Sequence, residues 1–152
     1  MPILAEVLGA CNAVSEYDGG MDANKLIEAA RVARLNAHAP YSGFKVGAAI
    51  LCDDGSIITG CNVENATYGL TICAERVAIV KAVSDGYTPG RFRAVAVVAD
   101  TDAPTPPCGA CRQILWEFCG DVEVILANLT EIKGRHMMAE LLPLPFDGRL
   151  LS

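Results

Sequence analysis

Hydrophobic and polar positions follow a helical period early in this chain. Apolar residues recur every three to four positions between residues 23 and 38, which predicts a helix there. Asp22 is the expected N-cap, and Pro40 is expected to stop the helix. The buried stripe is expected to consist of Leu26, Ala30, Ala33 and Ala37.

Four later segments have the pattern of β-strands. Residues 46–52 and 56–63 flank an Asp-Asp-Gly turn at 53–55, which is a strong signal for a hairpin. The continuous apolar runs at 94–99 and 122–127 are typical of strands covered on both faces. A weaker pattern at 130–136 predicts an edge strand.

Helical segments alternate with these strands. Residues 73–84 are so apolar that we expect burial on most of the helix circumference, with an end at Asp85 and Gly86. Residues 109–119 form the next expected helix, with Ile114, Leu115 and Phe118 inward and Gly120 as its stop. Residues 138–142 predict a short helix before a proline.

This order predicts an α/β fold, a three-layer sandwich with a mixed five-stranded sheet and helices on both faces. The chain has 152 residues, enough for one domain with a sizeable core. We assign residues 22–152 to that domain. Residues 1–21 are a segment of unclear role, in which residues 3–14 could form a short helix.

Composition narrows the functional class. Hydrophobic residues make up 52% of the chain, which excludes disorder and suggests some apolar surface buried between subunits. The net charge of -6 argues against long nucleic acid as a partner. No apolar run is long enough to cross a membrane. The odd count of seven cysteines and the lack of a basic leader predict a reduced, cytoplasmic protein.

Three cysteines carry the candidate chemistry. Cys73 and the pair Cys108 and Cys111 lie where two helical patterns begin, and a helix N-terminus favours the thiolate that binds metal. Three thiolates leave one position of a tetrahedral zinc open, as in catalytic sites. Glu75 lies two residues after Cys73, close enough to handle the proton of an activated water.

Other interpretations of these residues have to be weighed. A lone Cys-x-x-Cys pair is also typical of redox pairs and of structural zinc sites. A structural zinc module needs a fourth protein ligand, and neither His38 nor His136 fits a ligand motif. The other four cysteines have no partner spacing and are expected to be small buried hydrophobes. They are Cys11, Cys52, Cys61 and Cys119.

Zinc with three thiolates would carry a net charge of -1, which disfavours making hydroxide from water. Arg76 lies three residues after Cys73, on the same helical face, and could donate hydrogen bonds to sulfur. Arg112 is a weaker candidate for the same role. Gln113 could support a ligand sulfur, although an ordinary surface glutamine fits the position as well.

Polar and aromatic residues upstream suggest a ligand. Asn62 and Glu64 project to the same side of an extended chain and would suit adjacent hydroxyls, such as those of a sugar. An ordinary polar strand end is the alternative. Phe44 could stack on a flat ligand, although its position alone favours a core plug.

Five segments in order resemble the cytidine deaminases, of the small homotetrameric type with three cysteine zinc ligands. They are residues 41–48, 62–66, 73–76, 107–113 and 140–143. The resemblance spans about residues 22–146. It includes the ligand-x-Glu and Pro-Cys-x-x-Cys elements of zinc deaminases.

The resemblance implies zinc-dependent hydrolysis of cytidine and 2'-deoxycytidine to uridine and 2'-deoxyuridine plus ammonia, in pyrimidine salvage. It places Cys73, Cys108 and Cys111 on one zinc per chain, with Glu75 as proton shuttle. Asn62 and Glu64 would hold the ribose 3'-hydroxyl.

Several further residues acquire expected roles from the same resemblance. Phe44 would pack near the nucleoside, and Ala74 would meet the base through its backbone. Ala66, Tyr68 and Phe146 are candidates for reaching a site, within the chain or across an interface of a homotetramer with shared sites. A related alternative is a blasticidin S deaminase, against which Glu64 argues.

Overall fold

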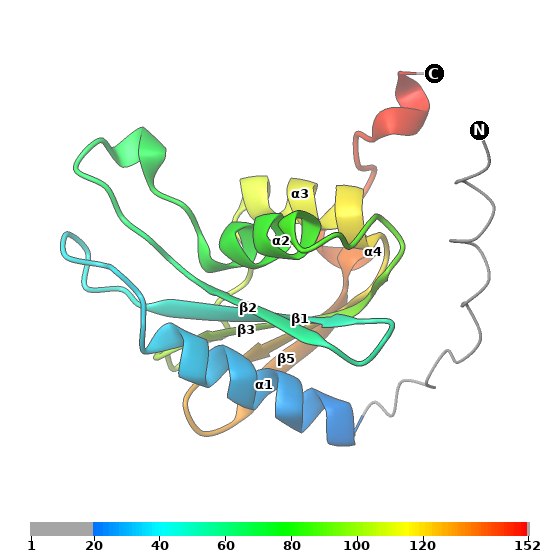
Figure 1. The fold of residues 1–152 in the computed structure, drawn as a ribbon. Helices are drawn as coiled ribbons and strands as arrows, with labels where there is room; N and C mark the ends of the chain where they lie inside the picture. Colours follow the sequence, from blue (N-terminus) through cyan, green and yellow to red (C-terminus); the bar gives the residue numbers. More distant parts are fainter. Residues whose placement is uncertain (1–19, 152) are drawn as a thin grey trace.

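The computed structural model describes residues 20–151, which fold around one mixed sheet (Figure 1). The strands are β1 (Val46–Cys52), β2 (Ile57–Cys61), β3 (Phe92–Ala99), β4 (Glu123–Ala127) and β5 (Ile132–Met137). They lie in the order β2-β1-β3-β4-β5. β3 and β4 are parallel, and the other neighbouring pairs are antiparallel. The helix suggested at residues 3–14 lies outside the described residues.

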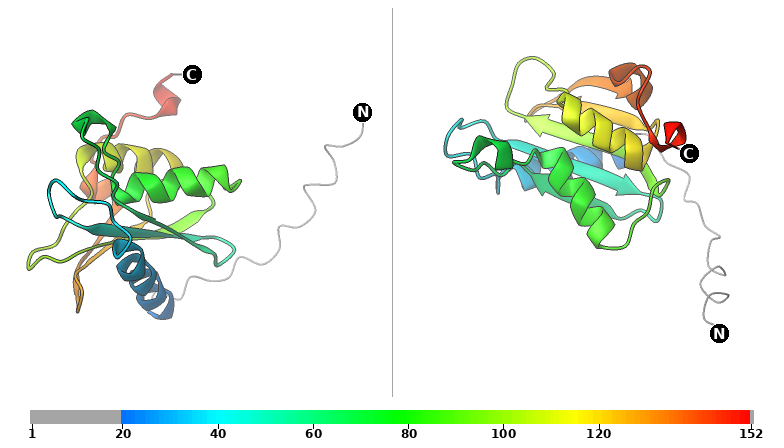
Figure 2. Two further views of the ribbon diagram at one scale, coloured as in Figure 1. Left: turned by 60° about the vertical axis from the view of Figure 1, so that its left-hand side comes forward. Right: turned by 90° about the horizontal axis from the view of Figure 1, so that it is seen from above.

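Helices cover both faces of the sheet, which confirms the expected three layers. They are α1 (Met21–Arg34), α2 (Ala74–Ser84), α3 (Gly109–Cys119) and α4 (Met138–Leu141), with 3-10 turns η1 (Tyr68–Leu70) and η2 (Gly148–Leu150). α1 lies on one face, and α2 and α3 lie side by side on the other (Figure 2). No helix within residues 20–151 has the length and apolar character needed to cross a bilayer.

Strand alternation divides the interior into two hydrophobic clusters. In β1, Ala48 and Ile50 belong to the cluster beneath α2 and α3, while Ala49 and Leu51 belong to the cluster beneath α1. β3 and β4 alternate in the same way, because successive side chains of a strand point to opposite faces. The two continuous apolar runs are therefore central strands, as predicted.

The first helix differs from its prediction at both ends. Gly20, not Asp22, is the N-cap, and Asp22 lies in the first turn. The helix ends at Arg34, because the next residues form a tighter turn and the backbone N–H of His38 donates to the carbonyl of Asn62. His38 then pairs with Val63. The predicted buried stripe is confirmed.

The expectation that α2 is buried on most of its circumference is wrong for this chain alone. Val80 is 53% exposed, and Val83 is also exposed. α2 packs on β1 and β2 below and on α3 at one side, so its remaining side faces outward. The sequence pattern therefore indicates an apolar side of α2 that no other element of residues 20–151 covers.

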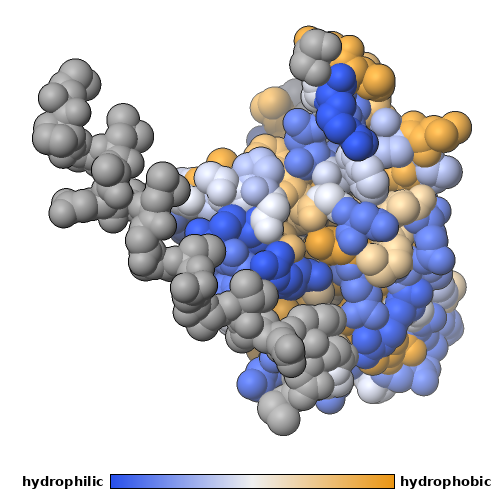
Figure 3. Space-filling view, turned by 90° about the vertical axis from the view of Figure 1, so that its right-hand side faces the viewer, coloured by the Kyte–Doolittle hydropathy of each residue, from blue (hydrophilic) through white to orange (hydrophobic). Residues whose placement is uncertain are grey.

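The C-terminal segment also leaves apolar side chains uncovered. Leu144 is 99% exposed, and Leu150 and Leu151 are mostly exposed. Hydrophobic surface gathers at the top of the molecule, where this segment projects (Figure 3). The Trp116 Nε1–H donates to the Asp147 carboxylate at 3.3 Å, which ties the segment to α3.

Gly60 lets β2 approach α2 closely. A Cβ there would lie 2.5 Å from both the Ala74 oxygen and the Ala78 nitrogen, two backbone atoms of α2. Gly60→Ala is therefore expected to reduce the free energy of unfolding by about 1–3 kcal/mol, measured by urea denaturation. Gly69→Ala is the control, because an added Cβ meets nothing within 4 Å. Equal stability of the two variants would contradict the close packing.

Candidate active site

The three predicted cysteines meet where two helices begin. Cys73 is the N-cap of α2, Cys108 is the N-cap of α3, and Cys111 lies buried in the first turn of α3. Their sulfur atoms lie within 4.8 Å of one another, and the Cys73 and Cys108 sulfurs are 3.9 Å apart. Thiolates on tetrahedral zinc lie about 3.8 Å apart at Zn–S distances of about 2.3 Å, so the donor set fits this ion.

Hydrogen bonding among the thiols favours a negative charge on Cys73. The hydrogen bond with Cys111 is the largest cause that lowers the pKa of the Cys73 thiol to about 5, and Arg76 contributes in the same direction. The same contact with Cys73, together with burial, raises the pKa of Cys111. One thiolate is thus already favoured before the other two thiols release their protons on binding a cation.

Arg76 reaches the cluster from the first turns of α2. Its Nη2 lies 3.5 Å from the Cys73 sulfur and donates to the Thr71 carbonyl at 3.1 Å. The contact with Cys73 raises the pKa of the guanidinium. The arginine therefore places a fixed positive charge beside the sulfurs, where the helical spacing predicted it.

Glu75 lies beside the same cluster and is only 4% exposed. Burial raises the pKa of its carboxyl, and the negative charge of Cys73 acts in the same direction. A buried carboxyl with a raised pKa holds a proton more readily near neutral pH than an ordinary glutamate does. This is the property that a proton-transferring group needs.

Glu75 and two of the sulfurs open onto one pocket of about 180 Å³. Its lining residues are Phe44, Val46, Asn62, Thr71, Cys73, Ala74, Glu75, Thr105, Pro106 and Cys108. Val46, Thr71, Thr105 and Pro106 were not predicted. Thr105 and Pro106 could have been predicted to lie near the site, because they come just before the Pro-Cys element at residues 107–108.

Residues 21–128 match the family model described as the cytidine and deoxycytidylate deaminase zinc-binding region. The chain belongs to this deaminase family. A cytidine deaminase from Sporosarcina psychrophila is 52% identical over 133 residues, covering 87% of this chain and 96% of the relative. A blasticidin-S deaminase from Bacillus cereus is 31% identical over 117 residues, covering 66% of this chain and 76% of the relative.

A solved structure supports the same assignment. The crystal structure of cytidine deaminase from Burkholderia pseudomallei has a TM-score of 0.79 and 51% sequence identity. The match covers 81% of this chain and 98% of that one. The mixed sheet with its helices is therefore the deaminase fold, and the chain of this zinc-binding family carries a cluster of three thiols able to hold a metal ion.

Asn62 holds one wall of the deaminase pocket. Its side-chain Nδ2 donates to the Phe44 carbonyl at 2.8 Å, and its Oδ1 accepts from the Val46 N–H at 2.8 Å. Both contacts fix the backbone on either side of residue 45. Phe44 lines the pocket as a result, so its side chain is not the core plug that its position alone favoured.

Glu64 holds the preceding part of the same loop. Its carboxylate accepts from the backbone N–H groups of Tyr41 at 2.9 Å and Ser42 at 3.2 Å, and from the Ser42 hydroxyl. The Ser42 oxygen in turn accepts from the Phe44 N–H at 3.0 Å. Ser42 was missed from the sequence. Asn62 and Glu64, which were predicted to project to the same side of the chain, therefore contact the same loop. Both residues hold this loop, residues 41–46, in place.

Glu64 lies in a hollow next to the deaminase pocket. That hollow is lined by Tyr41, Ser42, Glu64, Tyr68 and Thr71. Thr71 also lines the main pocket, so the two spaces adjoin. Tyr68 is 77% exposed and contacts Tyr41 edge to face, with ring centroids 6.1 Å apart. Ala66 is exposed on the same connection.

Three other candidate residues make contacts that do not involve the three sulfurs. The Gln113 amide donates to the Phe146 carbonyl at 2.7 Å. The amide that was expected to support a thiolate therefore binds a backbone carbonyl instead. Phe146 lies in the C-terminal groove beside α3, outside the pocket lining. Arg112 donates to the carbonyls of Pro107 and Leu141, so it braces the loop before Cys108.

The remaining cysteines have structural surroundings. Cys52 and Cys119 are buried in the core, as predicted, and burial raises their pKa values to about 11 and about 12. The expectation of burial is wrong for Cys61, which is partly exposed, and Cys11 lies outside the described residues. Within residues 20–151 the three sulfurs of Cys73, Cys108 and Cys111 form the one cluster able to hold a metal.

Proposed function

We propose that this chain catalyses the zinc-dependent hydrolytic deamination of cytidine and 2'-deoxycytidine, giving uridine or 2'-deoxyuridine and ammonia. One observation carries the proposal: a buried carboxyl of raised pKa and two members of a three-thiol cluster line the same pocket. The family and the named relatives supply the substrate class.

Cys73, Cys108 and Cys111 would hold the zinc, which leaves one coordination position for a water or substrate atom. Bound there, zinc supplies Lewis-acid chemistry that lowers the pKa of a water. Arg76 offsets part of the charge of the three thiolates through its contact with Cys73.

Glu75 moves the protons of the reaction. Its carboxylate takes a proton from the water that attacks C4 and delivers it to N3 of the pyrimidine. It then takes the second proton of that water from the C4 hydroxyl and gives it to the amine, which leaves as ammonia as the C4 carbonyl forms. The raised pKa of this buried carboxyl supports both steps, since the same group has to accept and release a proton near neutral pH.

The walls of the pocket support a nucleoside as substrate. Phe44 offers a ring to the base, and the buried start of α2 offers the backbone of Ala74. Glu64 has about four acceptor sites and uses three on the loop, which leaves one for a ribose hydroxyl. Asn62 likewise has a second amide hydrogen to donate.

The assembly proposed is a homotetramer with shared sites, in which Ala66, Tyr68 and Phe146 contact a neighbouring copy. The exposed apolar sides of α2 and of the C-terminal segment support this proposal. The free cysteines among residues 20–151 support a reducing, cytoplasmic location. The metabolic role proposed for the reaction is pyrimidine salvage. Residues 22–152 would form the single catalytic domain.

A blasticidin S deaminase is the second candidate, and the likeness to the Bacillus cereus enzyme favours it to that extent. Identity is higher with the cytidine deaminases, and Glu64 provides a partner for an ordinary ribose. A purely structural zinc module is disfavoured, since a fourth protein ligand is missing from the cluster within residues 20–151.

A substrate panel tests the proposal. Zinc-loaded protein is expected to deaminate cytidine and 2'-deoxycytidine with kcat/KM of about 10⁴ M⁻¹s⁻¹ or more. Cytidine monophosphate and blasticidin S are expected to react far more slowly under the same conditions. Chromatographic assay of each product gives the four values. A preference for blasticidin S, or for the monophosphate, would contradict the assignment.

A further inference from the structure

Residues 100–107 join β3 to α3 and form one wall of the proposed active site. Thr105 and Pro106 line the pocket, and Pro107 precedes the candidate zinc ligand Cys108. Three of the eight residues are prolines, which have no backbone N–H group to donate a hydrogen bond. The position of this wall therefore depends on its other contacts.

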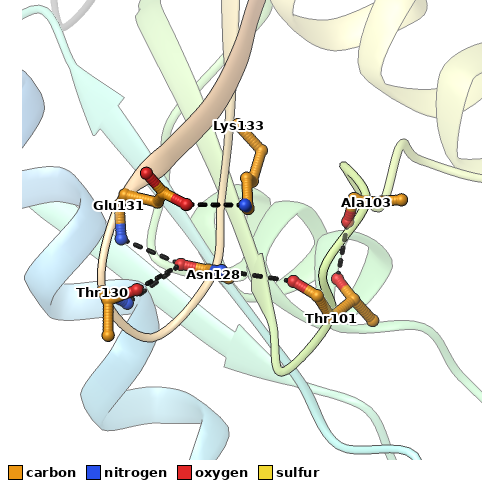
Figure 4. A network of polar contacts seen from close by, with 6 residues as sticks. All are labelled: Thr101, Ala103, Asn128, Thr130, Glu131 and Lys133. Atoms are coloured by element: carbon orange, nitrogen blue, oxygen red, sulfur yellow. Dashed lines mark hydrogen bonds and ion pairs between the residues drawn. The ribbon is translucent and has the colours of Figure 1, made fainter.

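Asn128, just after β4, makes one of those contacts. Its side-chain Nδ2 donates to the Thr101 carbonyl at 3.2 Å (Figure 4). Its Oδ1 accepts from the N–H and hydroxyl of Thr130 and from the N–H of Glu131. The Asn128 main-chain carbonyl accepts from Arg31 of α1 at 3.1 Å. This residue thus joins α1, the turn before β5 and the pocket loop.

A second hydrogen bond extends the contact to the pocket wall. The Thr101 hydroxyl donates to the Ala103 carbonyl at 2.8 Å and lies 2.9 Å from the Thr105 hydroxyl. A hydroxyl has one hydrogen, and that of Thr101 is already used. Thr105 must therefore be the donor in the second bond. The orientation of a pocket-lining side chain is thus set by Thr101.

We propose that Asn128 is a positioning residue for the deamination. It holds Thr101, and through Thr101 the wall formed by Thr105 and Pro106, at a fixed place in the pocket that Phe44 also lines. The role rests on the proposed function, because a pocket wall matters only if a substrate occupies the pocket. Asn128 is not among the residues that line the pocket, so it acts only through the loop of residues 100–107.

Asn128→Asp separates the two tasks of this side chain. The carboxylate keeps an acceptor for the turn at Thr130 and Glu131. It loses the donor to the Thr101 carbonyl and places two oxygens against each other. We expect KM for cytidine to rise about tenfold with a smaller change in kcat, because loss of a binding wall weakens ground-state binding. Zinc content is expected to stay unchanged.

Thr130→Val is the matched control. It removes one hydrogen bond from Asn128 on the turn side and leaves the bond to the loop intact. Its kinetic constants are expected to equal those of the parent protein. A rise in KM equal to that of Asn128→Asp would overturn the proposal, since the effect would then come from the turn. Parent-like kinetics in Asn128→Asp would overturn it as well.

Hydrogen exchange provides a readout that does not depend on activity. Peptides spanning residues 100–108 are expected to exchange faster in Asn128→Asp than in the parent protein or in Thr130→Val. Unchanged exchange would overturn the anchoring role. Absence of cytidine turnover in the parent protein would instead contradict the proposed function, while the exchange result would still decide the anchor.

Discussion

Replacing Glu75 with glutamine is expected to lower kcat for cytidine by about 10²–10⁴-fold. The amide has nearly the same shape as the carboxyl but cannot carry a proton from water to the pyrimidine ring. Because the glutamine fills the same buried space, zinc content and unfolding temperature are expected to change little. Steady-state rates, metal analysis and thermal unfolding measure these three quantities.

A matched control for this variant is Glu117→Gln, which changes an exposed glutamate on α3. It is expected to keep the parent kcat. Turnover within a factor of two of the parent in Glu75→Gln, with zinc present, would remove Glu75 from the mechanism. Loss of zinc in the same variant would assign the carboxyl a structural role at the metal site instead.

Removal of one thiol at the cluster should have the second large effect. Cys108→Ala is expected to reduce zinc from about one ion per chain to nearly none and to abolish turnover with it. Catalytic zinc sites use three protein ligands, and the two thiols that remain would hold the ion weakly. Metal analysis after gel filtration gives the zinc content, and the cytidine assay gives the activity.

Cys61→Ala provides the comparison for the loss of a thiol. Cys61 lies at the end of β2 and belongs to no metal-binding cluster among residues 20–151. Its variant is expected to keep both zinc and activity. Full zinc occupancy in Cys108→Ala would show that the ion is held elsewhere, and it would contradict the assignment of the three ligands.

The metal cluster could be predicted because its signals are local. Cys73 and Cys108 each begin a helix, and the spacing to Glu75 and Cys111 fixes which side chains share a helical turn. Arg76 follows from the same argument, and its contact with Cys73 lies where the spacing predicts it. The hairpin could be predicted from its turn residues, and the two central strands could be predicted from their apolar runs.

Contacts between segments that are distant in the chain could not be predicted from the sequence. Asn62 and Glu64 were expected to face a sugar, yet their partners in the structure are backbone groups of residues 41–46 and the Ser42 hydroxyl. Only the folded loop shows that they fasten Phe44 at the pocket. Asn128 and Thr101 lie 27 positions apart, and no periodicity relates them.

Errors of interpretation arose where tertiary contacts override local pattern. The helical pattern predicts a first helix that continues to residue 38, but His38 pairs with Val63, next to the pocket residue Asn62. The apolar side of α2 was assigned to the core, although Val80 faces outward in this chain. Periodicity shows that a face is apolar and does not show which molecule covers it.

The central claim is hydrolytic deamination of cytidine by a zinc-bearing site, and product analysis tests it most directly. Zinc-loaded protein is incubated with cytidine, and uridine and ammonia are measured before chelation, after chelation and after zinc is restored. We predict equal amounts of both products, loss of turnover with the metal and recovery on its return. Unchanged cytidine in the presence of fully zinc-loaded protein would contradict the account.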